Sequence, residues 1–219
     1  MAAPIAHIFL ALQMLTGPFS GLFNEREFII GTSFPDIRYL NVIDREKTHL
    51  SHVTLEEILQ EPDSFKAGML FHSFVDEQRE KYIVAHGFYG ELPSFIFITQ
   101  VLKFAEDIIL KHYFTIAPYV SYFDIILEQE KECGIDQKDI RRWHRFLQKY
   151  FCETKPYRNF MNFFDLLEPN AWRIKRLLFS YFYAYKMETI TSFIVRNKYM
   201  RKLILNFYMH FTDQILSNH

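Results

Sequence analysis

A histidine and an aspartate stand four residues apart, at His72 and Asp76, in a segment whose apolar spacing predicts an amphipathic helix over residues 64–85. Four residues are close to one helical turn, so both side chains lie on the same face. An imidazole followed one turn later by a carboxylate forms a convenient half of a metal site. A single inward-facing histidine is more often a hydrogen-bonded core residue, so the metal interpretation requires further ligands.

Three short stretches upstream of this helix supply further groups that bind metals. The candidates are His7 in PIAHIFLAL, Asp36 in GTSFPDIRYL, and His49 and His52 in THLSH. Taken singly, an aspartate after a proline can cap the next turn, and paired loop histidines are usually solvated. Taken together in the first third of the chain, they favour one metal centre. Imidazole and carboxylate groups are a ligand set that zinc accepts, with a position left for water.

Apolar spacing, together with proline, glycine and capping signals, predicts helices throughout and no strands. The first part of the chain is expected to hold helices at residues 5–15, ending at Gly17; 25–30, stopped by Gly31; 55–60, with a capping box of Thr54 and Glu57; and 64–85. The rest of the chain is expected to hold helices at residues 92–114, 118–134 (from Pro118 to near Gly134), 136–151 and 156–167, with Asp136 as the cap of the third. A long helical stretch is expected after residue 170, with one break between Lys186 and Tyr199. The predicted fold class is therefore all-α.

The composition supports a globular helical protein. The chain has 219 residues, of which 49% are hydrophobic and 18% aromatic, enough for a sizeable core. We expect a single all-α domain over residues 1–219, with the metal site in residues 1–113 and supporting helices in residues 114–219. The two cysteines have no CxxC spacing, so they are expected to be reduced thiols.

Charge and hydropathy restrict the partners and the location. The net charge of −1 gives no polyelectrolyte argument for a nucleic-acid partner. Acidic residues dominate residues 51–110, which suits a cation site, and basic residues dominate after residue 168. The basic part suits peripheral contact with an anionic membrane, and the simpler alternative is solvated helix faces. No apolar run is long enough to span a membrane, and the N-terminal stretch lacks a signal peptide's basic region. We therefore expect a cytoplasmic protein, or one exported without a classical signal peptide.

The order of these motifs resembles the zinc-dependent phospholipase C family, an all-α fold shared with the single-strand-specific zinc nucleases. That family has a histidine on its first helix, a small-residue turn leading to Pro-Asp, a loop histidine about a dozen residues later, and a helix with the pattern small-x-x-x-His-x-x-x-Asp. The matching stretches here are PIAHIFLAL, GTSFPDIRYL, THLSH and AGMLFHSFVDEQREKY. The resemblance covers residues 1–85, and beyond them only the helical character.

The resemblance implies two neighbouring zinc sites. The first would take four ligands, namely Asp36, His49 (or His52), His72 and Asp76. In the second, His7 would join Asp76, which would then bridge the two ions. Spacing favours His49 over His52, and the other histidine could contact substrate or support a ligand. One or two zinc ions are therefore expected.

The sequence also departs from the family pattern. The secreted enzymes use a mature N-terminal tryptophan as a ligand, which the sequence MAAP does not supply. Their third zinc site needs a histidine after the central helix, for which His86 is a candidate, and a His-x-x-x-Glu pair on the next helix. That helix offers Glu106 and Asp107 with no histidine one turn earlier. These three residues, and Glu80 beside the central motif, are candidates for an additional metal or for orienting the ligands. The third site is expected to be absent or altered.

The chemistry that the resemblance implies is hydrolysis of a phosphate ester by a zinc-activated water. Asp36 would be both a metal ligand and the general base, and Arg38 and Arg79 are candidates for contact with the substrate phosphate. The leading hypothesis is a zinc-dependent, phospholipase C-like hydrolase of a phospholipid or related phosphodiester. The same ligands would serve a zinc nuclease. The other alternative is a degenerate, non-catalytic helical protein that binds metal or a partner.

Overall fold

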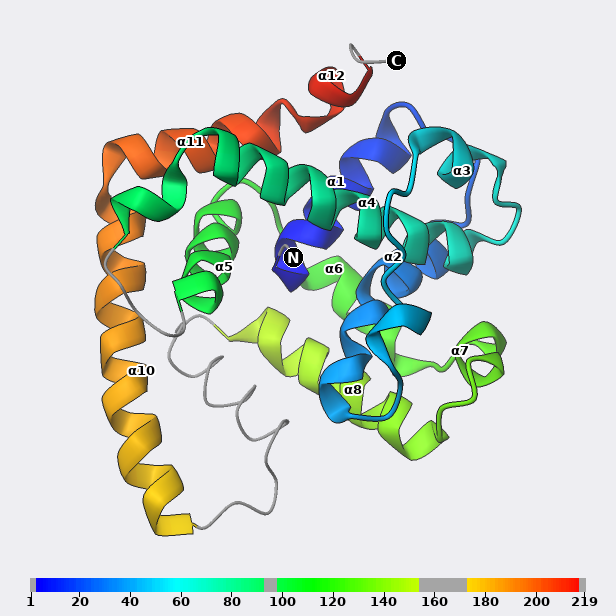
Figure 1. Cartoon of the computed structure of the whole chain (residues 1–219). Coiled ribbons are helices and arrows are strands. Elements are labelled where there is room, and N and C mark those ends of the chain that lie inside the picture. The colour runs from blue at the N-terminus through cyan, green and yellow to red at the C-terminus, as the bar shows by residue number, and fades with distance from the viewer. Residues whose placement is uncertain (1–2, 93–97, 154–172, 217–219) are drawn as a thin grey trace.

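The structure is a computed structural model that describes residues 3–92, 98–153 and 173–216 (Figure 1). Every regular element in these ranges is a helix, and no strand occurs in them. The prediction of an all-α fold is therefore confirmed. In the same ranges, no helix is long and apolar enough to cross a membrane.

The first helix, α1 (Pro4–Thr16), lies at the centre of the helical assembly. It packs against α2 (Glu25–Ser33), α4 (Ser64–Ala85), α5 (Ile98–Leu110) and α12 (Phe211–Leu216). Burial on every side explains why its sequence is apolar almost all round. Proline starts it at no cost, because the first N–H groups of a helix have no helical partner, and Gly17 ends it as predicted.

Helices α2 and α4 cross at two glycines. A Cβ atom on Gly31 would lie 2.0 Å from the carbonyl oxygen of Phe65, and one on Gly68 would lie 2.3 Å from that of Phe28. The prediction that Gly31 stops the second helix is therefore wrong, since α2 continues to Ser33. Glycine is present here because the two backbones touch.

Short elements connect these two helices. Asn24 caps α2, and η1 (Pro35–Leu40), a 3-10 helix, follows it directly. The predicted irregular stretch contains one 3-10 turn, η2 (Arg45–Lys47). The capping box predicted for Thr54 and Glu57 is confirmed at the start of α3 (Leu55–Gln60).

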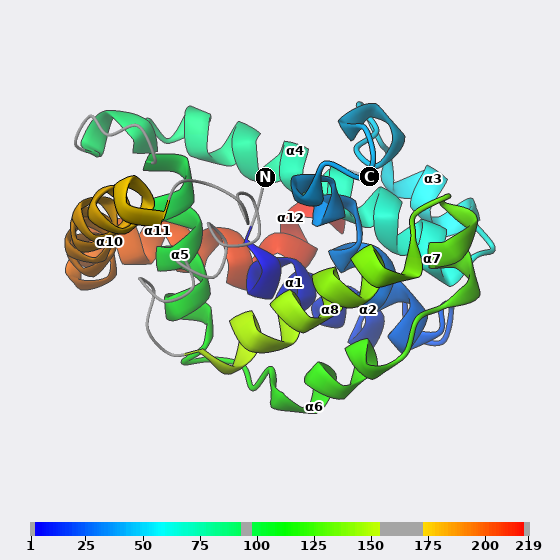
Figure 2. The ribbon, with the colours of Figure 1, turned by 90° about the horizontal axis from the view of Figure 1, so that it is seen from below.

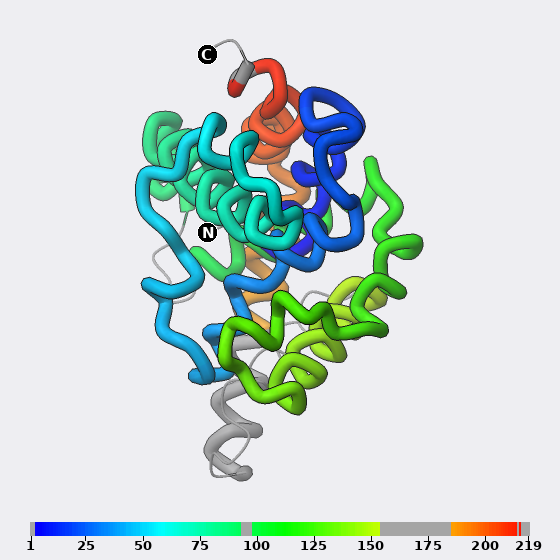
Figure 3. The backbone as a smooth tube through the Cα atoms, turned by 90° about the vertical axis from the view of Figure 1, so that its right-hand side faces the viewer, coloured from blue at the N-terminus to red at the C-terminus, as the bar shows by residue number. Residues whose placement is uncertain are grey.

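The predicted single helix from Pro118 to Gly134 is wrong. The chain instead forms α6 (Ala117–Val120), η4 (Ser121–Asp124) and α7 (Glu128–Glu132). Between residues 118 and 134 only Phe123 and Glu130 are buried, so no continuous apolar stripe could anchor one long helix. Figure 3 shows this segment in green, below the blue and cyan N-terminal helices.

The later helices frame the central ones. Asp136 caps α8 (Gln137–Cys152) as predicted, and α8 lies beside α6 on the face shown in Figure 2. Helix α10 (Arg173–Arg196) contacts α5 and leads into α11 (Lys198–Met209). The predicted break between Lys186 and Tyr199 falls at Asn197, which caps α11, but the prediction of a single break is wrong, because a second one at His210 separates α11 from α12. A further 3-10 turn, η3 (Phe88–Glu91), follows α4. Of the helix predicted over residues 92–114, α5 (Ile98–Leu110) covers the middle, and the chain leaves the helix in a turn at residues 111–113, before the predicted end. Residues 93–97 and the helix predicted at 156–167 lie outside the described residues.

Candidate metal centre

Five of the six predicted metal ligands converge in one buried cluster. The cluster comprises His7 of α1, Asp36 of η1, His49 of the loop after η2, and His72 and Asp76 of α4. Each is buried, with exposed fractions between 1% and 8%. Histidines and carboxylates gathered out of water require either compensating charges or a metal ion.

The nitrogen and oxygen atoms of the cluster have the spacing of ligands around a small cation. Two triads, His7–His72–Asp76 and Asp36–His49–His72, each keep their ligand atoms within 4.8 Å of one another. The Nε2 atoms of His49 and His72 lie 3.1 Å apart, and His72 Nε2 lies 3.6 Å from Asp76 Oδ2. Ligands held about 2.0–2.2 Å from a tetrahedral zinc ion lie roughly 3.3 Å from each other. The cluster therefore fits a zinc-sized divalent ion.

The carbonyl of Thr32 orients the ring of His72. It lies 2.8 Å from His72 Nδ1 and can only accept, so Nδ1 carries the proton and Nε2 presents a lone pair to the cluster. This carbonyl is free because it belongs to the last turn of α2, where carbonyl groups lack helical partners. The close crossing at Gly31 and Gly68 brings it within reach of α4.

A hydroxyl group orients the ring of His49 in the same way. The Thr48 hydroxyl lies 3.2 Å from the carbonyl of Arg45, to which it donates, and 3.0 Å from His49 Nδ1. The hydroxyl therefore accepts from Nδ1–H, and Nε2 faces the cluster, 3.6 Å from Asp36 Oδ1.

The structure also separates the two loop histidines, because His52 does not enter the cluster. Its side chain is 90% exposed, and its Nδ1 lies 3.9 Å from Glu77 Oε1. The choice of His49 over His52 thus has a geometric basis. The chain is exposed from Leu50 to His52, and the backbone of His52 itself is left-handed (φ 60°).

Helix α1 carries His7, and Asp107 of α5 holds its first turn. The His7 ring stacks on that of His72 at a centroid distance of 3.9 Å, with Nε2 3.2 Å from Asp76 Oδ1. Asp107 accepts the backbone N–H groups of Ile5 (3.3 Å) and Ala6 (2.9 Å), which no helical carbonyl could satisfy. Asp107 is therefore not placed as a metal ligand but supports the helix that carries one.

The electrostatics of the cluster favour the protonation states that metal ligands need. Burial alone would raise the pKa of Asp36, but His49, His72 and Lys103 more than offset it and hold the pKa well below its usual range. The pKa of Asp76 is also well below its usual range, because His72 and His7 outweigh its burial. Burial and the neighbouring His7 lower the pKa of His72 to about 3. At neutral pH the carboxylates are ionised and His72 is neutral, as metal binding requires.

Arg79 and Glu106 pair with each other and not with the cluster. Three hydrogen bonds of 2.7–3.1 Å join the buried guanidinium of Arg79 to the carboxylate of Glu106, and the Tyr208 hydroxyl donates to Glu106 at 2.9 Å. Arg79 is thus engaged away from any substrate phosphate, contrary to its predicted role. The guanidinium of Arg79 therefore binds Glu106, the carboxylate that the resemblance would assign to a third metal.

Two other candidates near the end of α4 are exposed and lie outside the cluster. Nδ1 of His86 lies 2.8 Å from the carbonyl of Tyr82 in its own helix, and Glu80 accepts the hydroxyl of Tyr89. Both face solvent, so neither supports the ligating imidazoles.

Arg38 lies beside the cluster, as its predicted phosphate role requires. Its Nη2 is 3.8 Å from Asp36 Oδ1 and donates to the Tyr39 hydroxyl at 3.1 Å. The guanidinium also stacks over the Tyr39 ring at 4.3 Å.

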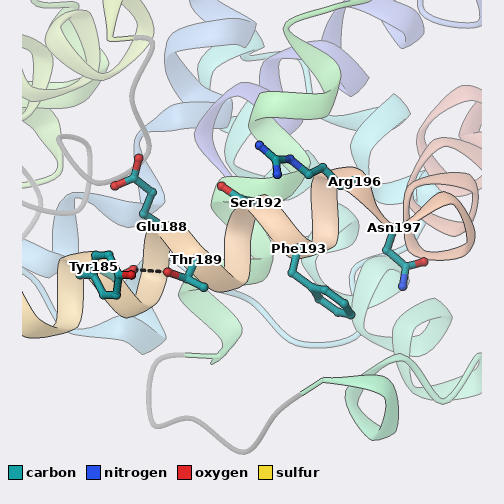
Figure 4. A pocket seen from close by; sticks show the side chains of 7 residues that line it. All are labelled: Tyr185, Glu188, Thr189, Ser192, Phe193, Arg196 and Asn197. Carbon is teal, nitrogen blue, oxygen red and sulfur yellow. Dashed lines mark hydrogen bonds between the residues drawn. The ribbon is translucent and has the colours of Figure 1, made fainter.

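Lys103 is a further charged residue that the sequence-based prediction missed. It lines a cavity of about 30 Å³ together with Asp36 and Tyr39 and is only 7% exposed. The signal for it was a basic residue inside the apolar run VLKFA of a helix expected to be buried. A larger hollow of about 620 Å³ runs along α10 (Figure 4), but the described residues that line it include no histidine or cysteine and a single carboxylate, Glu188.

Comparisons with family models, with curated proteins and with solved structures gave no match. The candidate metal centre is therefore defined by its own geometry and chemistry.

Proposed function

We propose that this chain is a zinc-dependent hydrolase of phosphate esters, acting on a phospholipid or a related phosphodiester. The observation that carries the proposal is the burial of three histidines and two aspartates, from four separate elements, with their ligand atoms facing one another. Such a cluster is costly to bury without a cation, so its presence supports a metal role. Zinc fits a ligand set of imidazoles and carboxylates.

The two oxygens of Asp76 support the assignment of two adjacent ions. Oδ2 faces His72 and His49, at 3.6 and 3.9 Å, and Oδ1 faces His7 at 3.2 Å. His72 cannot bridge two ions, because its Nδ1 is engaged with Thr32. The first ion would therefore have Asp36, His49, His72 and Asp76 as ligands, and the second would have His7 and Asp76.

Bound zinc would supply a nucleophilic water at neutral pH and positive charge for a phosphoryl oxygen. The residues of the chain would supply orientation and proton transfer. Asp36 lines the cavity beside the cluster, and its lowered pKa keeps it ionised, as a metal ligand must be. Its role as the general base is the one that the resemblance implies. Arg38 would bind a phosphate oxygen.

A basic and aromatic surface supports a phospholipid over other phosphodiesters. At the junction of α10 and α11, Phe193 and Tyr199 are 50% and 56% exposed, and the neighbouring Arg196, Lys198 and Lys202 are exposed too. Interfacial membrane contacts combine aromatic side chains with bases that attract anionic headgroups. Sedimentation with phosphatidylserine vesicles tests this contact, and Lys198→Glu with Lys202→Glu should weaken it. Equal binding to neutral vesicles, or none to either, would remove the support for a lipid substrate.

The zinc content of the purified protein is the direct test of the metal centre. We expect one or two equivalents, lost in His49→Ala and retained in His52→Ala, a matched variant three residues away. A protein without zinc, or a variant pair with equal zinc contents, would overturn the metal assignment.

Hydrolysis of chromogenic phosphodiesters by the zinc-loaded protein tests the reaction. Asp36→Asn should abolish turnover while circular dichroism shows an intact helical fold. Zinc binding without hydrolysis of any diester would favour the non-catalytic metal-binding alternative. Hydrolysis confined to single-stranded nucleic acid would favour the nuclease.

A further inference from the structure

Lys103 is buried beside the metal cluster, where its charge acts on Asp36 and Asp76 at longer range than a direct ion pair. Its side chain is 7% exposed, and it forms no hydrogen bond or ion pair with any residue that the structure describes. A lysine buried to this extent normally pairs with a carboxylate, because desolvation of an ammonium group is costly. Lys103 instead lines the small cavity that reaches Asp36.

We propose that Lys103, with the cavity it shares with Asp36 and Tyr39, forms an oxyanion subsite that binds a non-bridging oxygen of a phosphate group. The inference deepens the proposed function and rests on it. The ammonium group, the Tyr39 ring and the Gln100 side chain belong to the same cavity wall, so the subsite is polar as well as enclosed. Asp36 is the one residue that the subsite shares with the metal cluster; Lys103, Tyr39 and Gln100 lie outside the cluster.

The size of the cavity favours one oxygen atom over a whole phosphate group. Its volume of about 30 Å³ exceeds the roughly 10–15 Å³ that one water molecule needs, but it is too small for several. An oxygen of a phosphate bound above Asp36 would fill this volume and meet the ammonium group. The rest of the ester would remain outside the cavity.

The charges at the site point in the same direction. The carboxylates of Asp36 and Asp76 balance one divalent ion, so Lys103 leaves the loaded site with a net positive charge. With a second ion this excess grows. An anionic phosphate diester neutralises the excess, and a charge-assisted contact in a buried setting is among the stronger hydrogen bonds.

A different role for Lys103 makes an opposite prediction. If its charge only offset the two aspartates in the metal-free protein, its removal would strengthen zinc binding and leave phosphate binding unchanged. If it forms the subsite, its removal weakens phosphate binding and leaves the zinc content unchanged.

Calorimetric titration of the zinc-loaded protein with inorganic phosphate distinguishes these roles. Lys103→Met is close in volume and should reduce the phosphate affinity by roughly tenfold or more. Lys103→Arg should retain part of the affinity, and Lys66→Met, an exposed lysine on α4, should match the original chain. Lys103→Gln serves as the second neutral variant if the methionine variant does not fold. Unchanged phosphate affinity in the neutral variants, or no phosphate binding by the original chain, would overturn the subsite.

The kinetics of diester hydrolysis separate this inference from the proposed function. Loss of the subsite should raise KM, with a smaller effect on kcat. Hydrolysis that does not depend on Lys103 would remove the subsite and leave the hydrolase proposal standing. Phosphate binding that depends on Lys103, in a protein that hydrolyses no diester, would support the subsite and remove the hydrolase proposal.

Discussion

Helix α4 contributes to two buried polar clusters that differ in completeness. Arg79 donates three hydrogen bonds that reach both carboxylate oxygens of Glu106, and the Tyr208 hydroxyl donates a further one to Oε2. Three residues earlier on the same helix, Asp76 belongs to a cluster in which His7 Nδ1 and Asp36 Oδ1 are buried without a hydrogen bond. The Arg79 cluster has the features of a structural ion pair, and the His72 cluster has those of a ligand site.

The difference shows how two sets of buried charges can be separated by counting hydrogen bonds. Buried polar groups in folded proteins are nearly always paired, so an exception requires an explanation. Two imidazole Nε2 atoms facing each other at 3.1 Å would share at most one proton. A divalent cation among these atoms would satisfy several of them together, whereas the Arg79 cluster already contains its cation.

Breaking the Arg79 cluster should have the largest effect on stability. Arg79→Ala leaves the Glu106 carboxylate buried and unpaired, and should lower the free energy of unfolding by about 3–5 kcal/mol. Urea denaturation followed by circular dichroism measures this loss. The double variant Arg79→Met with Glu106→Leu should recover most of it, because it leaves no charge behind. A loss below about 1 kcal/mol in the single variant would mean that the pair is not the structural element we describe.

Zinc binding to the His72 cluster should stabilise the protein by supplying the cation that this cluster lacks. Zinc at a hundred times its dissociation constant should raise the free energy of unfolding by about 2.7 kcal/mol, since only the folded chain assembles the ligands. A thermal melt with and without a chelator measures this gain. The gain should vanish in His72→Ala and persist in Arg79→Lys, whose site is separate. A chelator-insensitive melting temperature in the original chain would contradict the comparison.

Local signals in the sequence were sufficient for much of the fold and site. The spacing of His72 and Asp76 placed both on one helical face, and capping signals located the starts of α3 and α8. Such features depend on residues within a few positions of each other. His7 was also predicted as a candidate ligand from its place in an apolar helix, and the structure buries it on α1.

Features that depend on distant partners were missed. Gly31 was interpreted as a helix stop because the approach of Phe65 to its Cα is set by the packing of α4. Arg79 was assigned to phosphate because its partner Glu106 lies 27 residues away on another helix. Lys103 was overlooked for the same reason, since only the fold places it beside Asp36. Tertiary pairing, not local propensity, decides these three positions.

A smaller change beside the His72 cluster should lower the zinc affinity and leave the fold almost unchanged. Thr48→Val removes the hydroxyl that orients His49, and second partners of this kind typically contribute about tenfold or more to metal affinity. Competition with a chromogenic chelator measures the change. Thr191→Val is a matched control, because that buried hydroxyl has no hydrogen-bond partner among the described residues. Equal zinc affinities in the two variants would show that the Thr48 contact does not position the ring.

The smallest expected effect concerns Asp107, which links the two clusters through α1 and α5. Burial raises its pKa to about 7, against the opposing hydrogen bonds from Tyr150 and the N–H groups of Ala6 and Ile5. The folded chain therefore binds this proton more tightly than the unfolded chain, so its contribution to stability is complete below about pH 4 and is lost as the pH rises to 7. The lowered pKa values of Asp36 and Asp76 add stability that is complete above about pH 4 and is lost only as the pH falls further. They therefore do not change the stability between pH 4.5 and pH 7.5.

Denaturation of the metal-free protein between pH 4.5 and 7.5 measures this dependence. His72, whose pKa is lowered to about 3, contributes the opposite slope in this range, so the part due to Asp107 is the difference between two proteins. Relative to Asp107→Asn, the original chain should lose on the order of 1 kcal/mol or more of stability between pH 4.5 and pH 7.5. The variant also loses one acceptor for the first turn of α1, so its stability at pH 4.5 should lie below that of the original chain. Equal slopes in both proteins would show that Asp107 stays ionised, and that the N–H groups of α1 outweigh its burial.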